Sequence, residues 1–90
     1  MVYELKFLGR ALEDFKRIDR PHREIIKEKL LILAANPEAL KNSIKRLAAN
    51  EDLFRLRIGS YRVIFKKEDR RLLILIVRIG HRKEIYWSLK

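Results

Sequence analysis

The sequence contains no cysteine, only three glycines and two prolines, and no long apolar run. Without cysteine the chain forms neither a disulfide framework nor a thiolate zinc site. No apolar stretch approaches the roughly 18 residues that a membrane-spanning helix needs. The first residues, Met1 to Glu4, also lack the charged-then-apolar layout of a signal peptide. These absences predict a cytoplasmic chain that does not enter a membrane.

Basic residues are the most abundant charged class. Lys and Arg number 22 against 12 Asp and Glu, which gives a formal net charge of +10 on 90 residues. This length predicts one domain over residues 1–90, and 48% hydrophobic residues are enough to fold it. A bias of this size favours a nucleic acid, an acidic membrane surface or an acidic protein as the partner. How the cations cluster decides between a binding surface and a generally basic, soluble one.

The first third of the chain predicts a strand followed by a helical hairpin. Residues 1–7 alternate between apolar and polar, as in a half-buried strand. Apolar residues then recur at helical spacing over residues 8–18. Asp19 and Pro21 predict a break and the start of a second helix, which ends before Pro37. The apolar stripe of this second helix consists of Ile26, Leu30, Leu33 and Ala34.

The rest of the chain is rich in strand-forming residues. Residues 38–50 are the least regular, and Leu40, Ile44 and Leu47 are expected to pin them to the core. Strands are predicted at 53–58, 61–67 and 71–79. The uninterrupted apolar run 72–77 indicates a central strand that is covered on both faces. The whole predicts an α+β fold: an N-terminal strand, a helical hairpin and a three-stranded antiparallel meander in one sheet, with the helices on one face.

Gly59-Ser60 predicts a two-residue hairpin turn of type II′, with glycine at the first central position. In such a hairpin Ile58 faces Tyr61 and Arg57 faces Arg62. The same register places six apolar residues on the face toward the helices: Phe54, Leu56, Ile58, Tyr61, Val63 and Phe65. The opposite face gathers Arg55, Arg57 and Arg62, with Lys66 nearby.

Two arginines that face each other are unusual, because like charges directly opposite across strands destabilise a sheet by up to about 1 kcal/mol. The arrangement is explained if an anion normally bridges Arg57 and Arg62, since a guanidinium matches two phosphate oxygens. The alternative is that these arginines pair with Glu51, Asp52 or Glu68. The pattern therefore favours a polyanion-binding hairpin, and RNA is the preferred ligand.

The last residues extend this basic surface. Gly80 is expected to end the last strand, after which Arg82 and Lys83 add charge. Tyr86 and Trp87 add rings on which a base can stack. Of the two rings, Trp87 is the better candidate for packing and Tyr86 for function.

Two runs, Leu53 to Phe65 and Gly80 to Tyr86, together resemble the signature of the RelE/ParE toxin superfamily. The likeness extends over nearly the whole chain, in length, element order and basic C-terminal half. The final run from Arg82 is more similar to the RelE branch than to the ParE branch.

The resemblance implies a toxin of a type II toxin–antitoxin pair. RelE-type toxins enter the ribosomal A site and cleave the mRNA there, by attack of a ribose 2′-OH on the adjacent phosphate. For this chain the resemblance implies an endoribonuclease that needs no metal or other cofactor, with the ribosome and mRNA as partners. It also implies an acidic RelB-like antitoxin, which neutralises the toxin by masking its arginines or by blocking its entry into the ribosome. The toxin alone is expected to be a monomer and to form a hetero-oligomer with its antitoxin.

The residues that work in RelE-type toxins match five positions here: Arg55, Arg57, Arg62, Arg82 and Tyr86. The other cations expected to bind RNA are Lys45, Arg46, Lys66, Arg78 and Lys83.

The chain departs from the family's pattern at Arg55 and Arg57, where the best-known members have lysine. Arginine does not lose its proton in proteins, so neither residue is a general base. Histidine is the side-chain type whose unperturbed pKa lies nearest to neutral pH, so His81 is one candidate base; Tyr86 and Glu84 are the others. Two alternative functions stay open: a ParE-like inhibitor of DNA gyrase, and a catalytically weak module that binds RNA or antitoxin.

Overall fold

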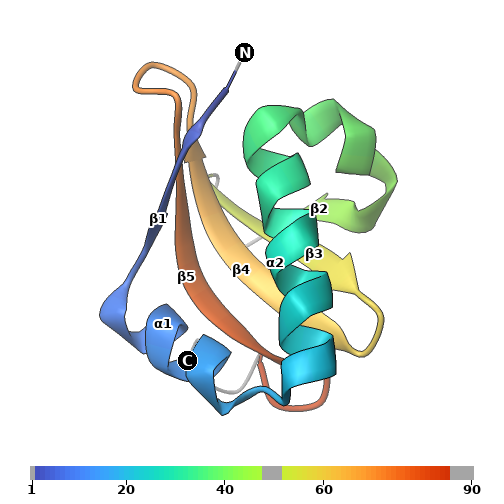
Figure 1. Ribbon diagram of the computed structural model, residues 1–90. Helices are drawn as coiled ribbons and strands as arrows, with labels where there is room; N and C mark the ends of the chain where they lie inside the picture. Colours follow the sequence, from blue (N-terminus) through green and yellow to red (C-terminus); the bar gives the residue numbers. More distant parts are fainter. Residues whose placement is uncertain (1, 48–51, 86–90) are drawn as a thin grey trace.

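A computed structural model describes residues 2–47 and 52–85. Its elements, in chain order, are β1 (Glu4–Phe7), α1 (Gly9–Arg17), α2 (Arg20–Ala35), the 3₁₀ helix η1 (Pro37–Ser43), β2 (Ile44–Arg46), β3 (Leu53–Ile58), β4 (Tyr61–Glu68) and β5 (Leu73–His81). The strands form one sheet in the order β1-β5-β4-β3-β2. Figure 1 shows α1 and α2 on the same side of this sheet, with β1 at its left-hand edge. The predicted α+β fold with helices on one face is confirmed.

The sheet combines an antiparallel meander with one parallel pair. Strands β2 to β5 pair antiparallel in succession, and β1 pairs parallel with β5. The prediction for β3 is confirmed to the residue, and β4 is one residue longer than expected. For β5, however, the predicted bounds are wrong: it begins after a turn in which Leu72 has φ 50°, and it continues through Gly80 because His81 still pairs with Tyr61.

The core lies between the helices and one face of the sheet. The predicted stripe on α2 is buried, and Ile26, Leu30 and Leu33 pack in one cluster with Ile74 and Ile76 of β5. On the other face of β5, Leu73 and Leu75 are only half-buried. The expectation that this strand is covered on both faces is therefore met fully on the helix side and only in part on the other.

The break between the helices lies where it was predicted, but the predicted side-chain cap of α2 does not form. Asp19 is the N-cap residue of α2 and Pro21 lies in its first turn. The Asp19 carboxylate does not cap the helix and instead bonds Nδ1 of His22 at 2.9 Å. This contact draws a negative charge to the helix N-terminus, where the helix dipole favours it.

Residues 37–46 form the part of the fold that sequence reasoning left irregular. The helix η1 leads into β2, an edge strand of 3 residues paired with β3. Leu40 and Ile44 are partly buried against the core, as expected. Within residues 2–47 and 52–85, no helix is both long and apolar enough to cross a membrane.

Candidate nucleic-acid interface

The β3–β4 hairpin has the predicted turn and register. Gly59 has φ 58°, a left-handed conformation that glycine adopts without strain. Ile58 pairs with Tyr61 and Arg57 with Arg62, so the two arginines do face each other. The six apolar residues of the hairpin point to the helices; four are buried, and Phe54 and Tyr61 are partly buried against the core. The other face carries the charged residues together with two apolar ones, Leu53 and the buried Ile64, which pairs with Arg55.

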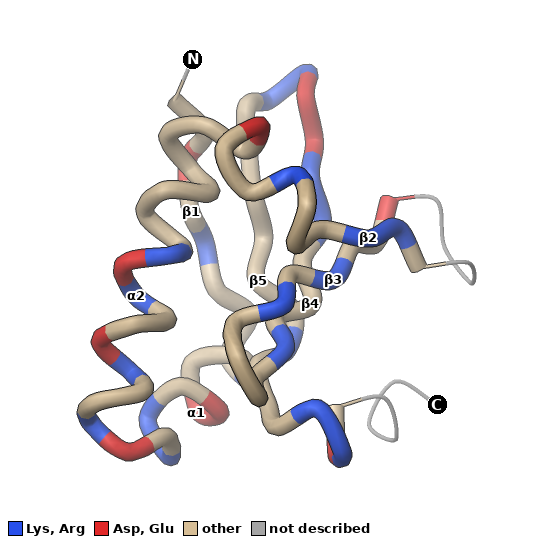
Figure 2. The backbone as a smooth tube through the Cα atoms, turned by 90° about the vertical axis from the view of Figure 1, so that its right-hand side faces the viewer, with Lys and Arg blue, Asp and Glu red and all other residues tan. Residues whose placement is uncertain are grey.

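Cations from three strands share this outer face. Lys45 of β2 pairs with Arg55 of β3, and Lys66 of β4 lies on the same side opposite Leu53. We call Lys45, Arg55, Arg57, Arg62 and Lys66 the cationic face. Strands β2 and β3, and β4 as far as Lys67, contain no acidic residue. Figure 2 shows Lys and Arg in blue along β2 and β3, whereas most Asp and Glu, in red, lie on the helices and near the turn between β4 and β5.

The side chains of this face differ in how they are held. One Arg62 nitrogen, Nη1, donates to the carbonyl oxygens of Gly59 at 2.8 Å and Tyr61 at 2.9 Å, which orients this guanidinium over the turn. Arg57, across from it, is exposed. The Nε of Arg55 is buried and makes no hydrogen bond within the described residues. Arg78 Nη1 is a second buried donor of this kind among the described residues, and buried donors usually have a partner, ordered water included, so neither atom by itself identifies an anion site.

Arg78, predicted to bind RNA, is instead engaged by an acid of α1. Its Nε donates to Asp14 Oδ2 at 2.7 Å and its Nη2 to Asp14 Oδ1 at 3.2 Å. The bond to Asp14 outweighs partial burial and raises the pKa of Arg78. Asp14 Oδ2 also accepts the N–H of Ile79 at 3.0 Å. Because β1 ends at Phe7, this contact covers the edge of β5 that β1 leaves free.

Arg46 also departs from its predicted role. It pairs with Phe54, which packs against the core, so it lies on the helix side of the sheet and not with Lys45. Its guanidinium carbon is 5.7 Å from the centroid of the Phe54 ring, a cation–π contact. Arg46 therefore does not contribute to the cationic face.

The segment after β5 returns to the hairpin turn. The N–H of Arg82 donates to the carbonyl of Ser60 at 2.8 Å, which brings Arg82 and the neighbouring Lys83 to the end of the sheet that holds Arg57 and Arg62. Both residues are exposed. The structure thus gathers Arg82 with the hairpin arginines, as the sequence predicts. Tyr86 and Trp87 lie outside the described residues.

His81 does not face the arginines. It pairs with Tyr61 on the helix side of the sheet, where the centroids of the two rings are 6.0 Å apart. The ring of His22 also contacts Tyr61, with 5.3 Å between the centroids. The Nδ1 of His81 is in contact with the N–H of Lys83 at 3.3 Å. This position does not support His81 as a base for a phosphate on the cationic face. Glu84 is exposed, and its N–H donates to the His81 carbonyl in the turn.

Two features near the ends of β4 and β5 were not foreseen. Gly80 allows Ile85 to pack on β5, because a Cβ on Gly80 would lie 3.2 Å from Ile85 Cδ1. At the other end, Asp69 accepts a hydrogen bond from the Tyr3 hydroxyl at 2.6 Å and an ion pair from Lys67 at 3.1 Å. We call Tyr3, Lys67 and Asp69 the Tyr3 clamp.

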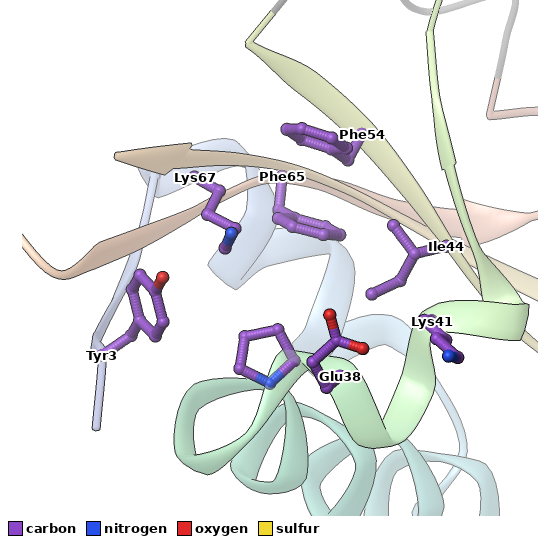
Figure 3. A pocket seen from close by; sticks show the side chains of 8 residues that line it. Tyr3, Glu38, Lys41, Ile44, Phe54, Phe65 and Lys67 are labelled. Atoms are coloured by element: carbon purple, nitrogen blue, oxygen red, sulfur yellow. The ribbon is translucent and has the colours of Figure 1, made fainter. Parts of the chain in front are cut away.

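The Tyr3 clamp borders a cleft of about 270 Å³ on the helix side of the sheet. Figure 3 shows Lys67 between the rings of Tyr3 and Phe65, with Glu38 of η1 across the opening. The hydrogen bond from Tyr3, with a smaller effect of Lys67, lowers the pKa of Asp69. The same hydrogen bond raises the pKa of Tyr3. Burial lowers the pKa of Lys67, but its contacts with Asp69 and Tyr3 outweigh burial and leave the pKa raised. The clamp ties the start of β1 to the turn between β4 and β5.

Comparisons with known proteins agree on one family. The family model described as the ParE toxin of type II toxin–antitoxin system, parDE, matches residues 5–86. The chain is 32% identical over 89 residues to the putative toxin RelE1 of Methanocaldococcus jannaschii, covering 96% of this chain and 97% of that protein. It is 26% identical over 90 residues to the mRNA interferase toxin RelE of Escherichia coli K12, covering 96% and 92%. The toxin in the crystal structure of the intact E. coli RelBE toxin–antitoxin complex superposes with a TM-score of 0.73 at 25% identity, covering 88% of this chain and 95% of that one.

Proposed function

The chain belongs to the ParE toxin family of type II toxin–antitoxin systems, within the RelE/ParE superfamily, and from that premise we propose that it is an endoribonuclease that cleaves mRNA in the ribosomal A site. An antitoxin is its protein partner, as in the RelBE complexes that it resembles. The ribosome and mRNA are its proposed partners in the cytoplasm. The name mRNA interferase, carried by E. coli RelE, supports this choice of target.

The observation that carries the proposal is the pairing of Arg57 with Arg62 on strands β3 and β4, whose residues as far as Lys67 include no acid. Two facing guanidinium groups repel each other in the free protein, and a phosphate between them removes the repulsion. The buried, unbonded Nε of Arg55 adds a donor beside them. A single-stranded RNA backbone supplies anions at intervals along such a face.

The proposed chemistry needs charge stabilisation more than any other effect. The 2′-oxygen bonds to phosphorus as its proton leaves, and the bond to the 5′-oxygen breaks as that oxygen gains a proton. The products are a 2′,3′-cyclic phosphate and a 5′-hydroxyl. Negative charge grows on the phosphoryl oxygens in the transition state, where preorganised donors act most strongly. We assign this role to Arg57, Arg62 and Arg82, in a reaction that uses no metal ion.

The proton acceptor is the remaining element of the proposal. Arginine stays protonated, which excludes Arg55 and Arg57 from this role. His81 lies on the helix side of the sheet, so we assign the proton transfer to Tyr86. A phenol acts as a base where cations favour its ionised form, and Tyr86 is one of the positions that match the working residues of RelE-type toxins.

The test is a translation reaction with purified ribosomes and a defined mRNA, read by primer extension. Arg62→Ala and Tyr86→Phe should each lower the rate of A-site cleavage by about 10²-fold or more, the usual cost of one such donor. Arg71→Ala is the matched control: Arg71 is an exposed arginine near the opposite end of the sheet, and its loss should leave cleavage unchanged. Normal cleavage by the Arg62 and Tyr86 variants, shown to be folded by circular dichroism, contradicts the site assignment.

Inhibition of DNA gyrase is the second candidate, favoured by the ParE name of the matching family model. A supercoiling assay run beside the translation reaction separates the two. Inhibited supercoiling with intact mRNA would replace the endoribonuclease proposal with the gyrase one. RNA binding that weakens steeply with salt, without cleavage on the ribosome, would instead identify a catalytically weak binding module.

A further inference from the structure

The chain turns back on itself at the end of β5, over residues 81–85. The N–H groups of Glu84 and Ile85 both donate to the carbonyl of His81, at 2.9 and 3.0 Å. The N–H of Arg82 donates to the carbonyl of Ser60 at 2.8 Å, in the turn between β3 and β4. We call residues 81–85 the 81–85 turn. Its backbone bond to the hairpin brings Arg82 to the end of the sheet at which the cationic face lies.

Charge opposes this position of the 81–85 turn. Arg82 and Lys83 are exposed, and they join an end of the sheet that already carries Arg57 and Arg62. Like charges that gather in this way repel one another. The backbone hydrogen bonds of an exposed turn resist local opening only weakly. A further contact is therefore needed to hold the turn in place.

Ile85 supplies that contact. Its side chain is 2% exposed, although the three residues before it, from Arg82 to Glu84, are exposed. Ile85 borders a cleft of about 290 Å³ together with Ile18 at the end of α1 and Ile79 of β5. Apolar surface removed from water stabilises the position in which it is buried. Ile85 thus anchors the 81–85 turn to the end of the sheet.

Gly80 makes room for this anchor. A Cβ on Gly80 would lie 3.2 Å from Cδ1 of Ile85, which is closer than the roughly 3.5–4.0 Å at which two carbon atoms pack best. Gly59 has a positive φ and Gly80 does not, so the backbone at Gly80 does not itself require glycine. Glycine at this place in β5 allows the close approach of the Ile85 side chain.

We propose that Gly80 and Ile85 are positioning residues for Arg82: their contact fixes the 81–85 turn against β5 and so holds the Arg82 guanidinium ready for the scissile phosphate. Neither residue touches the RNA. The inference deepens the proposed function and rests on it, because it takes Arg82 as a donor to the phosphate. A donor stabilises a transition state most when it needs no reorganisation during the reaction, and a fixed turn meets that condition.

The first measurement is the single-turnover rate of mRNA cleavage on the ribosome at saturating toxin. Gly80→Ala should lower this rate about tenfold, since a small misplacement of a catalytic group is costly. Gly80→Ala/Ile85→Val should return to within about threefold of the wild type, because valine lacks the Cδ1 methyl that the new Cβ meets. Gly9→Ala is the matched control: a Cβ on Gly9 meets nothing within 4 Å, and the rate should not change.

A variant of Arg82 separates positioning from a general effect on the fold. In an Arg82→Ala background, Gly80→Ala should change the rate by less than about twofold, because residues that act as one unit are not additive. Ile85→Ala, which removes the anchor instead of crowding it, should depend on Arg82 in the same way. Equal losses with and without Arg82 overturn the proposal. A Gly80→Ala/Ile85→Val variant that is no faster than Gly80→Ala overturns it as well.

Hydrogen exchange tests the positioning without RNA. The Arg82 amide should exchange about tenfold faster in Gly80→Ala than in the wild type, and at the wild-type rate in Gly80→Ala/Ile85→Val and Gly9→Ala. The Leu12 amide, bonded to Leu8 in α1, is the internal reference. Unchanged exchange at Arg82 in Gly80→Ala overturns the proposal. A wild type that cleaves no mRNA refutes the proposed function, and the exchange rates then decide by themselves whether Gly80 and Ile85 position Arg82.

Discussion

Arg78 and Arg57 lie on the same sheet and carry the same side chain, but their surroundings differ. Arg78 is largely buried, and its guanidinium forms a two-point ion pair with Asp14. Arg57 is exposed and has another arginine across from it. At one place the fold supplies the counter-ion, and at the other it supplies a second cation. The difference indicates that Arg78 serves the fold, whereas the exposed Arg57 suits the anion that we propose it binds.

Burial on the other side of the hairpin explains why the sheet tolerates the facing pair Arg57 and Arg62. Below the cationic face, the opposite side of the β3–β4 pair is an apolar layer in which Leu56, Val63 and Phe65 are almost fully buried. Burial of one such side chain stabilises a fold by about 1.5–3 kcal/mol, which exceeds the roughly 1 kcal/mol cost of one facing pair of like charges. The apolar face can therefore hold the register that the arginines alone would oppose.

The largest change in stability is expected when Asp14, the ion-pair partner of Arg78, is replaced. Asp14→Ala leaves a largely buried guanidinium and the Ile79 N–H without an acceptor, and should lower the free energy of unfolding by about 3 kcal/mol. Urea unfolding followed by far-ultraviolet circular dichroism measures it. Glu13→Ala, at the exposed neighbouring residue of α1, is the control and should change stability by less than about 0.5 kcal/mol.

The partner variant sharpens this result. An Asp14→Ala/Arg78→Met double variant removes both charges and should recover part of the loss, because an unpaired buried charge costs more than no charge. If Asp14→Ala is as stable as Glu13→Ala, Asp14 does not anchor the edge of β5, and the contrast with Arg57 has no structural basis.

A smaller effect of opposite sign is expected at Arg57. Arg57→Thr removes the repulsion with Arg62 and should raise the free energy of unfolding by up to about 1 kcal/mol. The same variant should bind a single-stranded RNA oligomer more weakly, with a salt dependence reduced by about 0.7, the value of one phosphate contact on a single strand. Urea unfolding and fluorescence anisotropy over a series of salt concentrations measure the two quantities.

Arg71→Thr provides the control for this prediction. Arg71 pairs with Glu68 near the turn between β4 and β5, away from the hairpin turn. Its replacement should change neither stability nor RNA affinity appreciably. A loss of stability in Arg57→Thr would show that Arg57 has an acid partner after all, and the cationic face would then be an ordinary set of ion pairs.

Arg57 and Arg78 also show which contacts could be predicted from the sequence. The hairpin was predictable because its turn has two residues and strands have a period of two, so one assignment sets every pair. Asp14 was not, because its partner is 64 residues away and nothing local distinguishes it from Glu13 on the same helix. Local patterns give register and faces, whereas contacts between distant elements depend on the packing of the whole fold.

The remaining errors have similar causes. With only 3 residues, β2 is too short to show a period and was not predicted, so Arg46 was grouped with the RNA-binding cations although it lies on the helix side of the sheet. His81 was placed beside the arginines because the last strand was ended at Ile79; two further residues of strand turn its ring to the Tyr61 side. The role of Tyr86 stays a prediction, since it lies outside the described residues.

The smallest expected effect concerns the Tyr3 clamp. Its size shows whether burial or ion pairing accounts for the difference between Arg78 and Arg57. The clamp is a paired cluster like Asp14–Arg78, but the Asp69 side chain is 72% exposed. Exposed ion pairs contribute about 0–1 kcal/mol, so Tyr3→Phe should cost only a few tenths of a kcal/mol near pH 7. The pKa of Asp69 is lowered in the fold, so its contribution is present above its ordinary pKa near 4 and is lost as the pH falls through the lower, folded pKa. The pKa of Tyr3 is raised, so its contribution is present below pH 10 and is lost as the pH rises through the folded pKa.

The stability difference between the wild type and Tyr3→Phe should therefore be largest between about pH 4 and 10 and should shrink on both sides of that range. Urea unfolding at a series of pH values measures this difference, with Asp14→Ala followed in parallel. Because Asp14 and Arg78 are largely buried, their loss should remain several times larger than that of the clamp at neutral pH. A clamp that matches Asp14–Arg78 in size would mean that pairing alone anchors these contacts. In that case the exposure of Arg57 would not explain the RNA binding that we propose for it, and the absence of acids from β3 and from β4 as far as Lys67 would carry that explanation alone.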